Sequence, residues 1–236
     1  MEAARALGRQ PCRIALKALD YSGRFCQTFR VTGLSEISLA NLITLARLPL
    51  LLLLVGLLFV PSFPAALLGV GLLVVLYLLD WFDGYIARLR NEVTEMGAVL
   101  DVALDRAVEN ILWITFMYIG MVPLWVPIVF LIRSFIVDGV RGVALAQGKS
   151  GFGMMHTPLG RFLVASRFMR AFYGLAKAVV FGCLYLTHAL AIKDPDVLAT
   201  LHPLNQGLIF LAVGLCVLRG IPVVLDGRIY FSSKRL

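Results

Sequence analysis

The sequence predicts an all-α integral membrane protein, and three observations support this fold class. First, 60 % of the 236 residues are hydrophobic and only 15 % are charged, with a mean hydropathy of +0.87, which does not describe a soluble domain. Second, long uncharged stretches recur, and a helix needs about 20 such residues to cross a bilayer. Third, proline, glycine or charged residues interrupt the apolar sequence between these stretches. The uncharged stretches are Leu48–Leu79, Asn110–Ile132, Ala178–Ile192 and Val197–Leu218.

The N-terminal segment, residues 1–36, is basic and carries scattered apolar residues between breaks at Pro11 and Gly23. This composition predicts an interfacial amphipathic helix on an anionic membrane face, with a mobile tail as the alternative. A six-helix bundle is expected over residues 37–226, followed by a basic tail over residues 227–236. The predicted spans are 39–60, 64–87, 97–120, 124–147, 161–190 and 204–225. The breaks between them are expected at Pro61 and Pro64, Arg90–Glu95, Pro123, Gly148–Pro158 and Asp194–Pro203.

The distribution of Lys and Arg predicts the orientation of the spans. With the N-terminus inside, the inner segments hold fourteen cations, whereas the outer loops hold only Lys193. Because Lys and Arg favour the cytoplasmic side, both termini are expected in the cytoplasm. The net charge of +8 is therefore explained by topology, and no nucleic-acid partner is predicted. The inner cations are Arg5, Arg9, Arg13, Lys17, Arg24, Arg30, Arg88, Arg90, Arg141, Lys149, Arg161, Arg228, Lys234 and Arg235.

Four aspartates lie near the inner ends of the second and third spans. Asp80 and Asp83 are three residues apart on one helix, and Asp101 and Asp105 are four residues apart on the next, so each pair occupies one helical face. The short connection between the two helices brings these faces together. Acidic residues in membrane spans are costly, and like charges so close require compensating cations. The spacing thus predicts a pocket of carboxylates that binds one or two Mg²⁺ or Mn²⁺ ions.

Three residues beside these carboxylates suit a metal-bound diphosphate. Gly84 and Ala87 remove side-chain bulk on the same face, where a base or a phosphate could approach the backbone, and Arg88 offers a planar fork to phosphate. Asn41, Thr44 and Arg47 form a polar stripe on the otherwise apolar first span, and this stripe is expected to face the same pocket.

The stretch D-W-F-D-G-Y-I-A-R from Asp80 to Arg88, followed by Gly97, Asp101 and Asp105, resembles the CDP-alcohol phosphotransferase signature D-x2-D-G-x2-A-R-x8-G-x3-D-x3-D without a mismatch. The stripe from Asn41 to Arg47 is similar to the family's N-x2-T-x2-R pattern. The resemblance covers about residues 39 to 220. It implies a membrane transferase in which an alcohol attacks the β-phosphorus of CDP-diacylglycerol and releases CMP. A homodimer with its active site facing the cytoplasm, in a bacterial inner membrane, is the expected setting.

The same resemblance implies a role for individual residues. Asp80, Asp83 and Asp101 would be metal ligands, and Asp105 would share a metal and act as the general base on the incoming hydroxyl. The CDP-lipid would be bound by Asn41, Thr44, Gly84, Ala87 and Arg88.

The choice of acceptor alcohol rests on cations in the fourth and fifth spans. These two spans hold six cations and one acid, Asp138, which is more positive charge than a choline or serine acceptor requires. Arg133, Arg141 and Arg170 are the residues expected to bind an acceptor that carries its own phosphate. The six cations are Arg133, Arg141, Arg161, Arg167, Arg170 and Lys177. The stretch from Arg133 to Arg141 resembles R-E-x3-S-x2-R of phosphatidylglycerolphosphate synthases, with Ser134 and Asp138 as departures. Glycerol 3-phosphate is the first choice of acceptor. Inositol phosphate or another polar alcohol remains open, and so does the alternative that these arginines only anchor helices at the headgroups.

Two other classes of protein are compatible with intramembrane carboxylates. A divalent-cation transporter would need them deeper in the spans and would need a second gate. A catalytically silent scaffold would tolerate the loss of an aspartate, but this chain keeps all four.

Overall fold

A computed structural model of the chain describes residues 39–90, 95–146 and 157–232. The chain divides into two units, Met1–Ser38 and Leu39–Leu236, and only residues of the second unit are described. The predicted interfacial segment at residues 1–36 lies outside the described residues. So do Asn91 and Lys149, and the last four residues of the tail.

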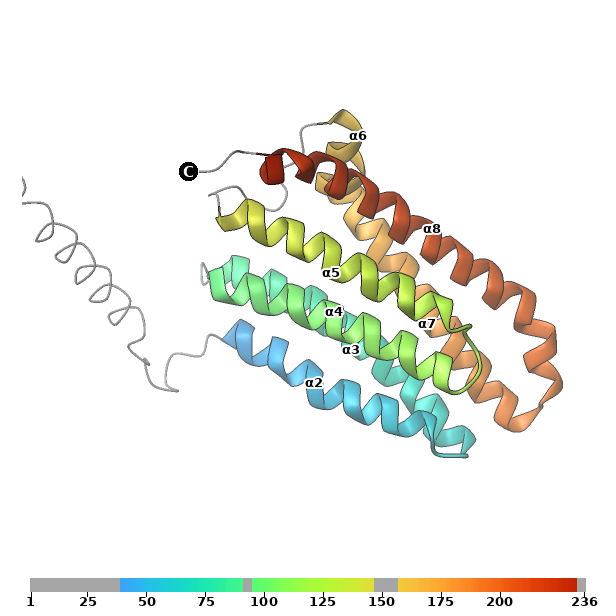
Figure 1. Ribbon diagram of the computed structural model, residues 1–236. Coiled ribbons are helices and arrows are strands. Elements are labelled where there is room, and N and C mark those ends of the chain that lie inside the picture. Colours follow the sequence, from blue (N-terminus) through green and yellow to red (C-terminus); the bar gives the residue numbers. More distant parts are fainter. Residues whose placement is uncertain (1–38, 91–94, 147–156, 233–236) are drawn as a thin grey trace, which may run out of the picture. The chain divides into compact units, whose positions relative to one another are not determined.

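The described residues form helices and contain no strand, which confirms the all-α fold class (Figure 1). Among the described helices, α2 packs on α3 and α4, α4 on α5, and α7 on α8. Contacts between segments far apart in the sequence include α3 with α7 and α5 with α8. The helices are α2 (Leu39–Leu58), α3 (Phe63–Arg90), α4 (Glu95–Tyr118), α5 (Trp125–Ala146), α6 (Pro158–Gly160), the π-helix η2 (Arg161–Ala165), α7 (Arg167–Lys193) and α8 (Asp196–Ser232).

The core is apolar and aromatic. The Trp113 ring of α4 stacks on Phe130 of α5 with centroids 4.8 Å apart and contacts Phe181 of α7 at 4.6 Å. A second contact fixes α7 against α2 and α3, because the Tyr185 hydroxyl donates a hydrogen bond to the Leu54 carbonyl at 2.9 Å. Gly69 of α3 makes this approach possible, since a Cβ there would lie 2.1 Å from the tyrosine oxygen.

The turn between α4 and α5 requires glycine. Gly120 has a φ of 79°, in the left-handed region, and its N–H bonds to the Met117 carbonyl while the Met121 N–H bonds to the Phe116 carbonyl. This pair of hydrogen bonds is the Schellman ending of a helix, which explains why the chain reverses just before the predicted break at Pro123.

The fifth predicted span is wrong at its start. Instead of one helix over 161–190, α6 and the π-helix η2 precede an extended residue, Ser166, and α7 begins at Arg167. Ser166 ends the irregular turn because its hydroxyl accepts a hydrogen bond from the Met169 N–H and caps α7. The preceding segment is held to α8, since the backbone N–H and the hydroxyl of Thr157 both donate to Asp226.

The sixth predicted span, 204–225, is too short. Helix α8 runs from Asp196 to Ser232 and includes Pro203, which sequence analysis placed in a break. The helix starts early because the Asp194 carboxylate accepts a hydrogen bond from the Asp196 N–H at 3.1 Å, which caps its first turn. Pro203 therefore lies inside the helix, where it lacks the N–H that would bond to the preceding turn.

Among the residues that the structure describes, three helices contain stretches whose length and composition would let them cross a membrane: Phe63–Phe82, Phe168–Lys193 and Asp196–Arg228. The apolar stretch of α2, Thr44–Leu58, is shorter. Large apolar side chains point outward from several helices, as expected for a surface that meets lipid. The most exposed of them include Leu52, Phe135, Phe168, Leu175 and Phe210. The chain is thus an integral membrane protein, and the count of six spans remains a prediction.

Candidate active site at the charged end of the bundle

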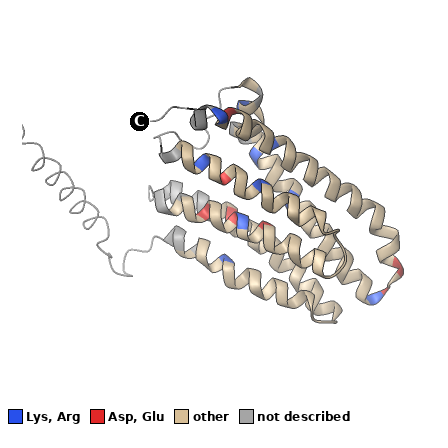
Figure 2. Ribbon diagram, in the orientation of Figure 1, with Lys and Arg blue, Asp and Glu red and all other residues tan. Residues whose placement is uncertain are grey.

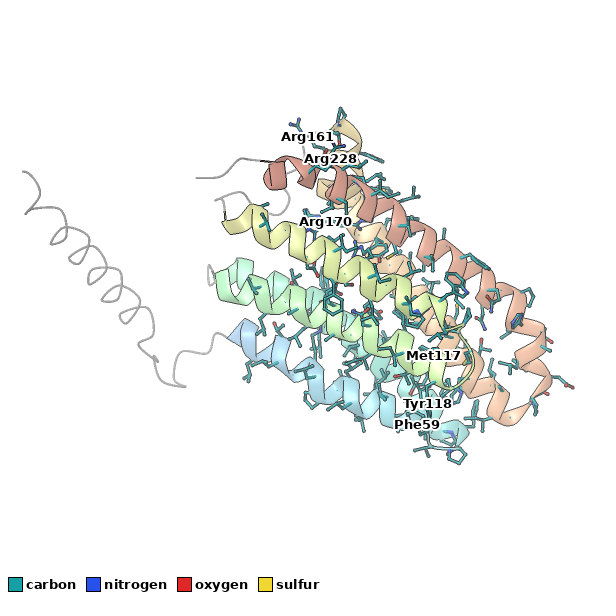
Figure 3. The ribbon with its side chains drawn as sticks, in the orientation of Figure 1. Phe59, Met117, Tyr118, Arg161, Arg170 and Arg228 are labelled. Carbon is teal, nitrogen blue, oxygen red and sulfur yellow. The ribbon has the colours of Figure 1, made fainter. Side chains whose placement is uncertain are left out.

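Most of the charged residues lie toward one end of the helices (Figure 2). That end holds the C-terminal parts of α3, α5 and α8 and the N-terminal parts of α4 and α7 (Figure 1). In Figure 3, Arg161, Arg170 and Arg228 lie at this end, whereas Phe59, Met117 and Tyr118 lie at the other. The charges at the opposite tip belong to the turn between α7 and α8, which contains Lys193, Asp194 and Asp196.

Two of the predicted metal-binding carboxylates meet at one guanidinium. The Nη1 atom of Arg47 pairs with Asp80 from α3 and lies 3.6 Å from Oδ1 of Asp101 from α4. Arg47 belongs to α2 and its side chain is only 1 % exposed, while the two aspartates are partly exposed. Side chains from three helices, α2, α3 and α4, therefore meet here. Thr44 is buried one turn before Arg47 on α2.

Several predicted site residues lie on described helices, but their side chains are outside the description. Asp83, Gly84, Ala87 and Arg88 belong to the last turns of α3, and Asn41 belongs to the first turn of α2. Their proposed contacts with metal or CDP-lipid stay predictions.

Asp105 contacts a lysine from a helix far along the chain. Lys177 of α7 places its Nζ 3.6 Å from Oδ1 of Asp105 and 3.4 Å from Oε2 of Glu109. Asp105 and Glu109 are four residues apart on α4 and so share a face. Lys177 is buried, and its ammonium is shared between the two carboxylates.

Glu109 is the centre of a buried network that sequence analysis did not predict. Its side chain is 2 % exposed and has three partners. Arg106 Nη1 donates to Oε2 at 2.9 Å, and the Tyr173 hydroxyl donates to Oε1 at 3.1 Å. The third partner is Lys177, which forms an ion pair with Oε2. A carboxylate so deeply buried is stable as an anion only because these partners compensate its charge.

Beyond Tyr173 lies a group of cations. The guanidinium carbon of Arg219, from α8, is 4.7 Å from the centre of the Tyr173 ring, and that of Arg133, from α5, is 5.8 Å away. Both arginines are more than nine-tenths buried. Within the described part of the chain, Nε and Nη1 of Arg133 and Nε of Arg219 have no hydrogen-bond partner. Buried guanidinium nitrogens without acceptors suit a bound anion.

Arg141 has a carboxylate near it. Its Nη1 lies 3.9 Å from Oδ1 of Asp138, and the other oxygen of Asp138 is 3.4 Å from Nε of Arg106. Asp138, noted above as a departure from the related pattern, therefore compensates part of the positive charge between α4 and α5. Arg170 lies in the first turn of α7 at the same end of the bundle (Figure 3).

The described carboxylates have the chemistry that a divalent cation requires. Asp80 and Asp101, from two helices, both direct carboxylate oxygens at Nη1 of Arg47. Such oxygens are hard ligands of the kind that Mg²⁺ and Mn²⁺ prefer. Among the residues whose side chains are described, no group of three or more His, Cys, Asp and Glu has the spacing of a metal site. The side chain of the predicted ligand Asp83 is not among those residues.

Sequence analysis missed Glu109, Tyr173 and Arg219 as members of this region. Glu109 follows Asp105 by one helical turn, so the i,i+4 spacing that identified the other carboxylates could have identified it. Tyr173 and Arg219 carry no such signal, because only the packing of α7 and α8 on α4 and α5 brings them to the site.

Comparison with known proteins finds several relatives of the chain. The chain is 33 % identical over 124 residues to the CDP-diacylglycerol–glycerol-3-phosphate 3-phosphatidyltransferase of Bacillus subtilis. The aligned region covers 48 % of this chain and 64 % of the relative. It is 33 % identical over 104 residues to the protein of the same name from Rickettsia bellii, 44 % of this chain and 58 % of the relative. It is 38 % identical over 82 residues to a putative cardiolipin synthase of Mycobacterium tuberculosis, 35 % of this chain and 39 % of the relative.

The chain thus spans less than two thirds of the length of these relatives. The profile of one family, however, matches residues 37–218, which include α2 to α7 and most of α8. The chain therefore belongs to the CDP-alcohol phosphatidyltransferase family.

Proposed function

We propose that this protein transfers the phosphatidyl group of CDP-diacylglycerol to an alcohol and releases CMP, with glycerol 3-phosphate as the acceptor. The observation that carries the proposal is the convergence of Asp80 and Asp101 on one point of positive charge, at the end of the bundle where Asp105 and the arginines also lie. Family membership and the names of the two phosphatidyltransferase relatives support it. No observation favours the cation transporter or the silent scaffold.

In this reaction a bond forms between the acceptor oxygen and the β-phosphorus, and the bond from that phosphorus to the CMP oxygen breaks. Asp105 takes the proton of the acceptor hydroxyl, which makes the oxygen a better nucleophile. Asp80, Asp83 and Asp101, with a share from Asp105, would hold two Mg²⁺ or Mn²⁺ ions. Such ions would supply positive charge that neutralises the diphosphate and stabilises the negative charge developing on the phosphate oxygen of the leaving CMP.

The CDP-lipid site would be built by α2 and α3. Thr44, buried on α2, and Asn41 one turn earlier would face the nucleotide. Gly84 and Ala87 would leave room for it beside the α3 backbone, and Arg88 would bind a phosphate of the diphosphate. The fork geometry of arginine suits that contact better than a lysine would.

The acceptor site would be built by α5 and α7. Arg133, Arg141 and Arg170 would bind the phosphate of the acceptor, and the buried guanidinium nitrogens of Arg133 that lack a partner support this role. Arg219 of α8, which shares the Tyr173 ring with Arg133, extends the same site. Inositol phosphate would satisfy these cations equally well and remains the second candidate acceptor.

The site would face the cytoplasm of a bacterial cell, in the inner membrane, with the protein acting as a homodimer. The excess of Lys and Arg on the predicted inner segments supports this orientation.

One assay tests the proposed function. Purified protein in lipid nanodiscs is incubated with CDP-diacylglycerol, Mg²⁺ or Mn²⁺ and one acceptor at a time, and CMP release is measured. The acceptors are glycerol 3-phosphate, inositol phosphate, phosphatidylglycerol, inositol and serine. We expect release with a phosphorylated acceptor, dependent on the cation and abolished by chelation. CMP release that is equal with unphosphorylated inositol or serine would contradict an anionic acceptor, and no release with any alcohol would refute the transfer reaction.

A further inference from the structure

The two halves of the site are connected by a single buried carboxylate, that of Glu109. One of its oxygens, Oε2, binds Arg106 and lies 3.4 Å from Lys177. The other, Oε1, accepts the Tyr173 hydroxyl hydrogen bond. The partner of one oxygen, Lys177, contacts Asp105, and the partner of the other, Tyr173, places its ring against the arginines of the acceptor site. The two partners also touch each other, since the Lys177 Nζ lies 5.0 Å from the centre of the Tyr173 ring.

Stability alone does not account for this network. Burying an ion pair costs desolvation energy, and apolar side chains of similar volume commonly serve as well or better. Helices α4 and α7 already have such packing, because Trp113 and Phe116 contact Phe181 one to two turns further along the same interface. A charged network beside an adequate apolar interface therefore calls for a role in the chemistry.

The Lys177 contact bears on the general base. Asp105 and Glu109 lie one turn apart on the same face of α4, and the ammonium of Lys177 lies between them. While Glu109 holds the ammonium in this shared position, Lys177 fixes Asp105 from one side. Without Glu109, Lys177 would be free to pair with Asp105 alone, which would draw that carboxylate away from the acceptor hydroxyl.

The Tyr173 contact bears on the acceptor phosphate. Tyr173 is 5 % exposed, and its hydroxyl is held by Glu109. Its ring therefore has a fixed position against the guanidinium groups of Arg133 and Arg219. An aromatic face attracts cations, so the ring holds two guanidiniums near each other in spite of their like charge.

We propose that Glu109 is a positioning residue that sets the distance between the general base and the acceptor phosphate. It acts through Lys177 on Asp105 and through Tyr173 on Arg133 and Arg219. The inference rests on the proposed function, in which Asp105 takes the proton of a phosphorylated alcohol. A fixed distance between base and phosphate-binding groups is what holds a short acceptor in line for attack.

The main test separates positioning from stability. Glu109→Gln and Lys177→Met each remove one charge of a buried ion pair and unbalance the charges that remain, whereas the double variant removes one charge of each sign. We expect each single variant to unfold at a lower temperature and the double variant to recover most of the loss. Yet kcat for CMP release should stay at least tenfold below wild type in all three, with KM for CDP-diacylglycerol within threefold. A double variant that regains wild-type kcat together with its stability would overturn the proposal.

A milder change keeps the proposal testable if the charge-removing variants fail to fold. Glu109→Asp retains the charge but withdraws the carboxylate by one methylene. We expect it to lower kcat at least fivefold while the protein stays folded, and wild-type kcat in this variant would overturn the proposal. Tyr173→Phe tests the other branch: it should raise KM for the acceptor at least threefold and leave kcat within twofold. An unchanged KM would remove Tyr173 from the mechanism and overturn the two-branch role of Glu109.

A matched control lies between α7 and α8, away from the charged network of Glu109. Asn205 of α8 donates a buried hydrogen bond to Thr187 of α7 at 3.0 Å. Asn205→Leu should lower thermal stability but leave kcat and KM unchanged. A tenfold loss of kcat in this variant would mean that any change to a buried polar residue lowers kcat, and this result would overturn the proposal. A wild-type protein that releases no CMP would refute the proposed function, whereas an active wild type with an equally active Glu109→Asp variant would refute this inference alone.

Discussion

At the scale of single residues, two buried cations each pair with two carboxylates at the candidate site. Arg47 is buried in α2 and contacts carboxylates from α3 and α4, and Lys177 is buried in α7 and contacts two carboxylates of α4. The stabilities contributed by an acidic residue and a cation in a buried ion pair depend on each other, because removing one side chain leaves the charge of the other only partly compensated. The effects of substitutions are therefore expected to differ sharply between residues of the same type.

Asp101→Asn tests the proposed metal-binding carboxylates. The change keeps the side-chain volume but removes one negative charge, so we expect CMP release to fall more than a hundredfold while the protein remains folded in the membrane fraction. A variant that retained more than a tenth of the wild-type rate would have lost less than about 1.4 kcal/mol of transition-state stabilisation, too little for a metal ligand. Asp194→Asn, in the turn at the opposite end of the bundle, is the control.

Arg133→Ala and Arg219→Ala test the acceptor site. If the proposed acceptor site is correct, each variant loses a charge-assisted hydrogen bond to the acceptor phosphate, worth about 1.5–3 kcal/mol. We expect KM for glycerol 3-phosphate or inositol phosphate to rise tenfold or more, and KM for CDP-diacylglycerol to stay within about twofold. If the arginines only hold α5 and α8 against Tyr173, expression and stability will fall and the acceptor KM of the remaining active protein will not change.

At the scale of helices, close approach of α7 to α2 and α3 sets the frame of the site. Tyr185 crosses from α7 to the Leu54 carbonyl of α2 and occupies the space beside Gly69 of α3. A side chain at position 69 would force this tyrosine out of its place. Because α7 also carries Tyr173 and Lys177, a shift of this helix would reach the charged network.

Gly69→Ala should therefore destabilise the protein. The new Cβ would lie 2.1 Å from the Tyr185 hydroxyl oxygen, and overpacking of this kind costs about 1–3 kcal/mol. We expect the temperature of thermal unfolding to fall by several degrees. Gly71→Ala is the matched control on the same helix, since no atom lies within 4 Å of a Cβ there. Equal stability of the two variants would contradict the close packing of Tyr185.

At the scale of the whole molecule, the distribution of cations predicts the membrane topology, that is, which side of the membrane each terminus and loop faces. We expect single cysteines at Asn91 and near either terminus to be protected from an impermeant thiol reagent added outside intact cells, and a cysteine at Asp194 to be labelled. The four native cysteines must first be replaced. A labelled N-terminus would place the carboxylates on the outer face and contradict the proposed orientation.

The sequence by itself determined the helical class, the approximate position of the helices and the place of the aspartates. Hydropathy and the spacing of Asp80, Asp101 and Asp105 are properties of short segments, so they need no knowledge of the fold. The boundaries of α7 and α8 were predicted less well, because caps at Ser166 and Asp194 decided them. Such hydrogen bonds compete with the proline and glycine signals on which the boundaries were based.

Only the tertiary structure decided how the charges are paired. Glu109 and Tyr173 are 64 residues apart, and Arg219 reaches the same ring from α8. The pairing of cations with carboxylates depends on how each helix is rotated about its axis and how deeply it packs. Small changes in rotation or depth alter the distances between charges, and the electrostatic energy depends strongly on those distances. The sequence therefore predicted that cations and carboxylates would gather at one end, and the packing of α4, α5, α7 and α8 selected Glu109 as the residue that connects them.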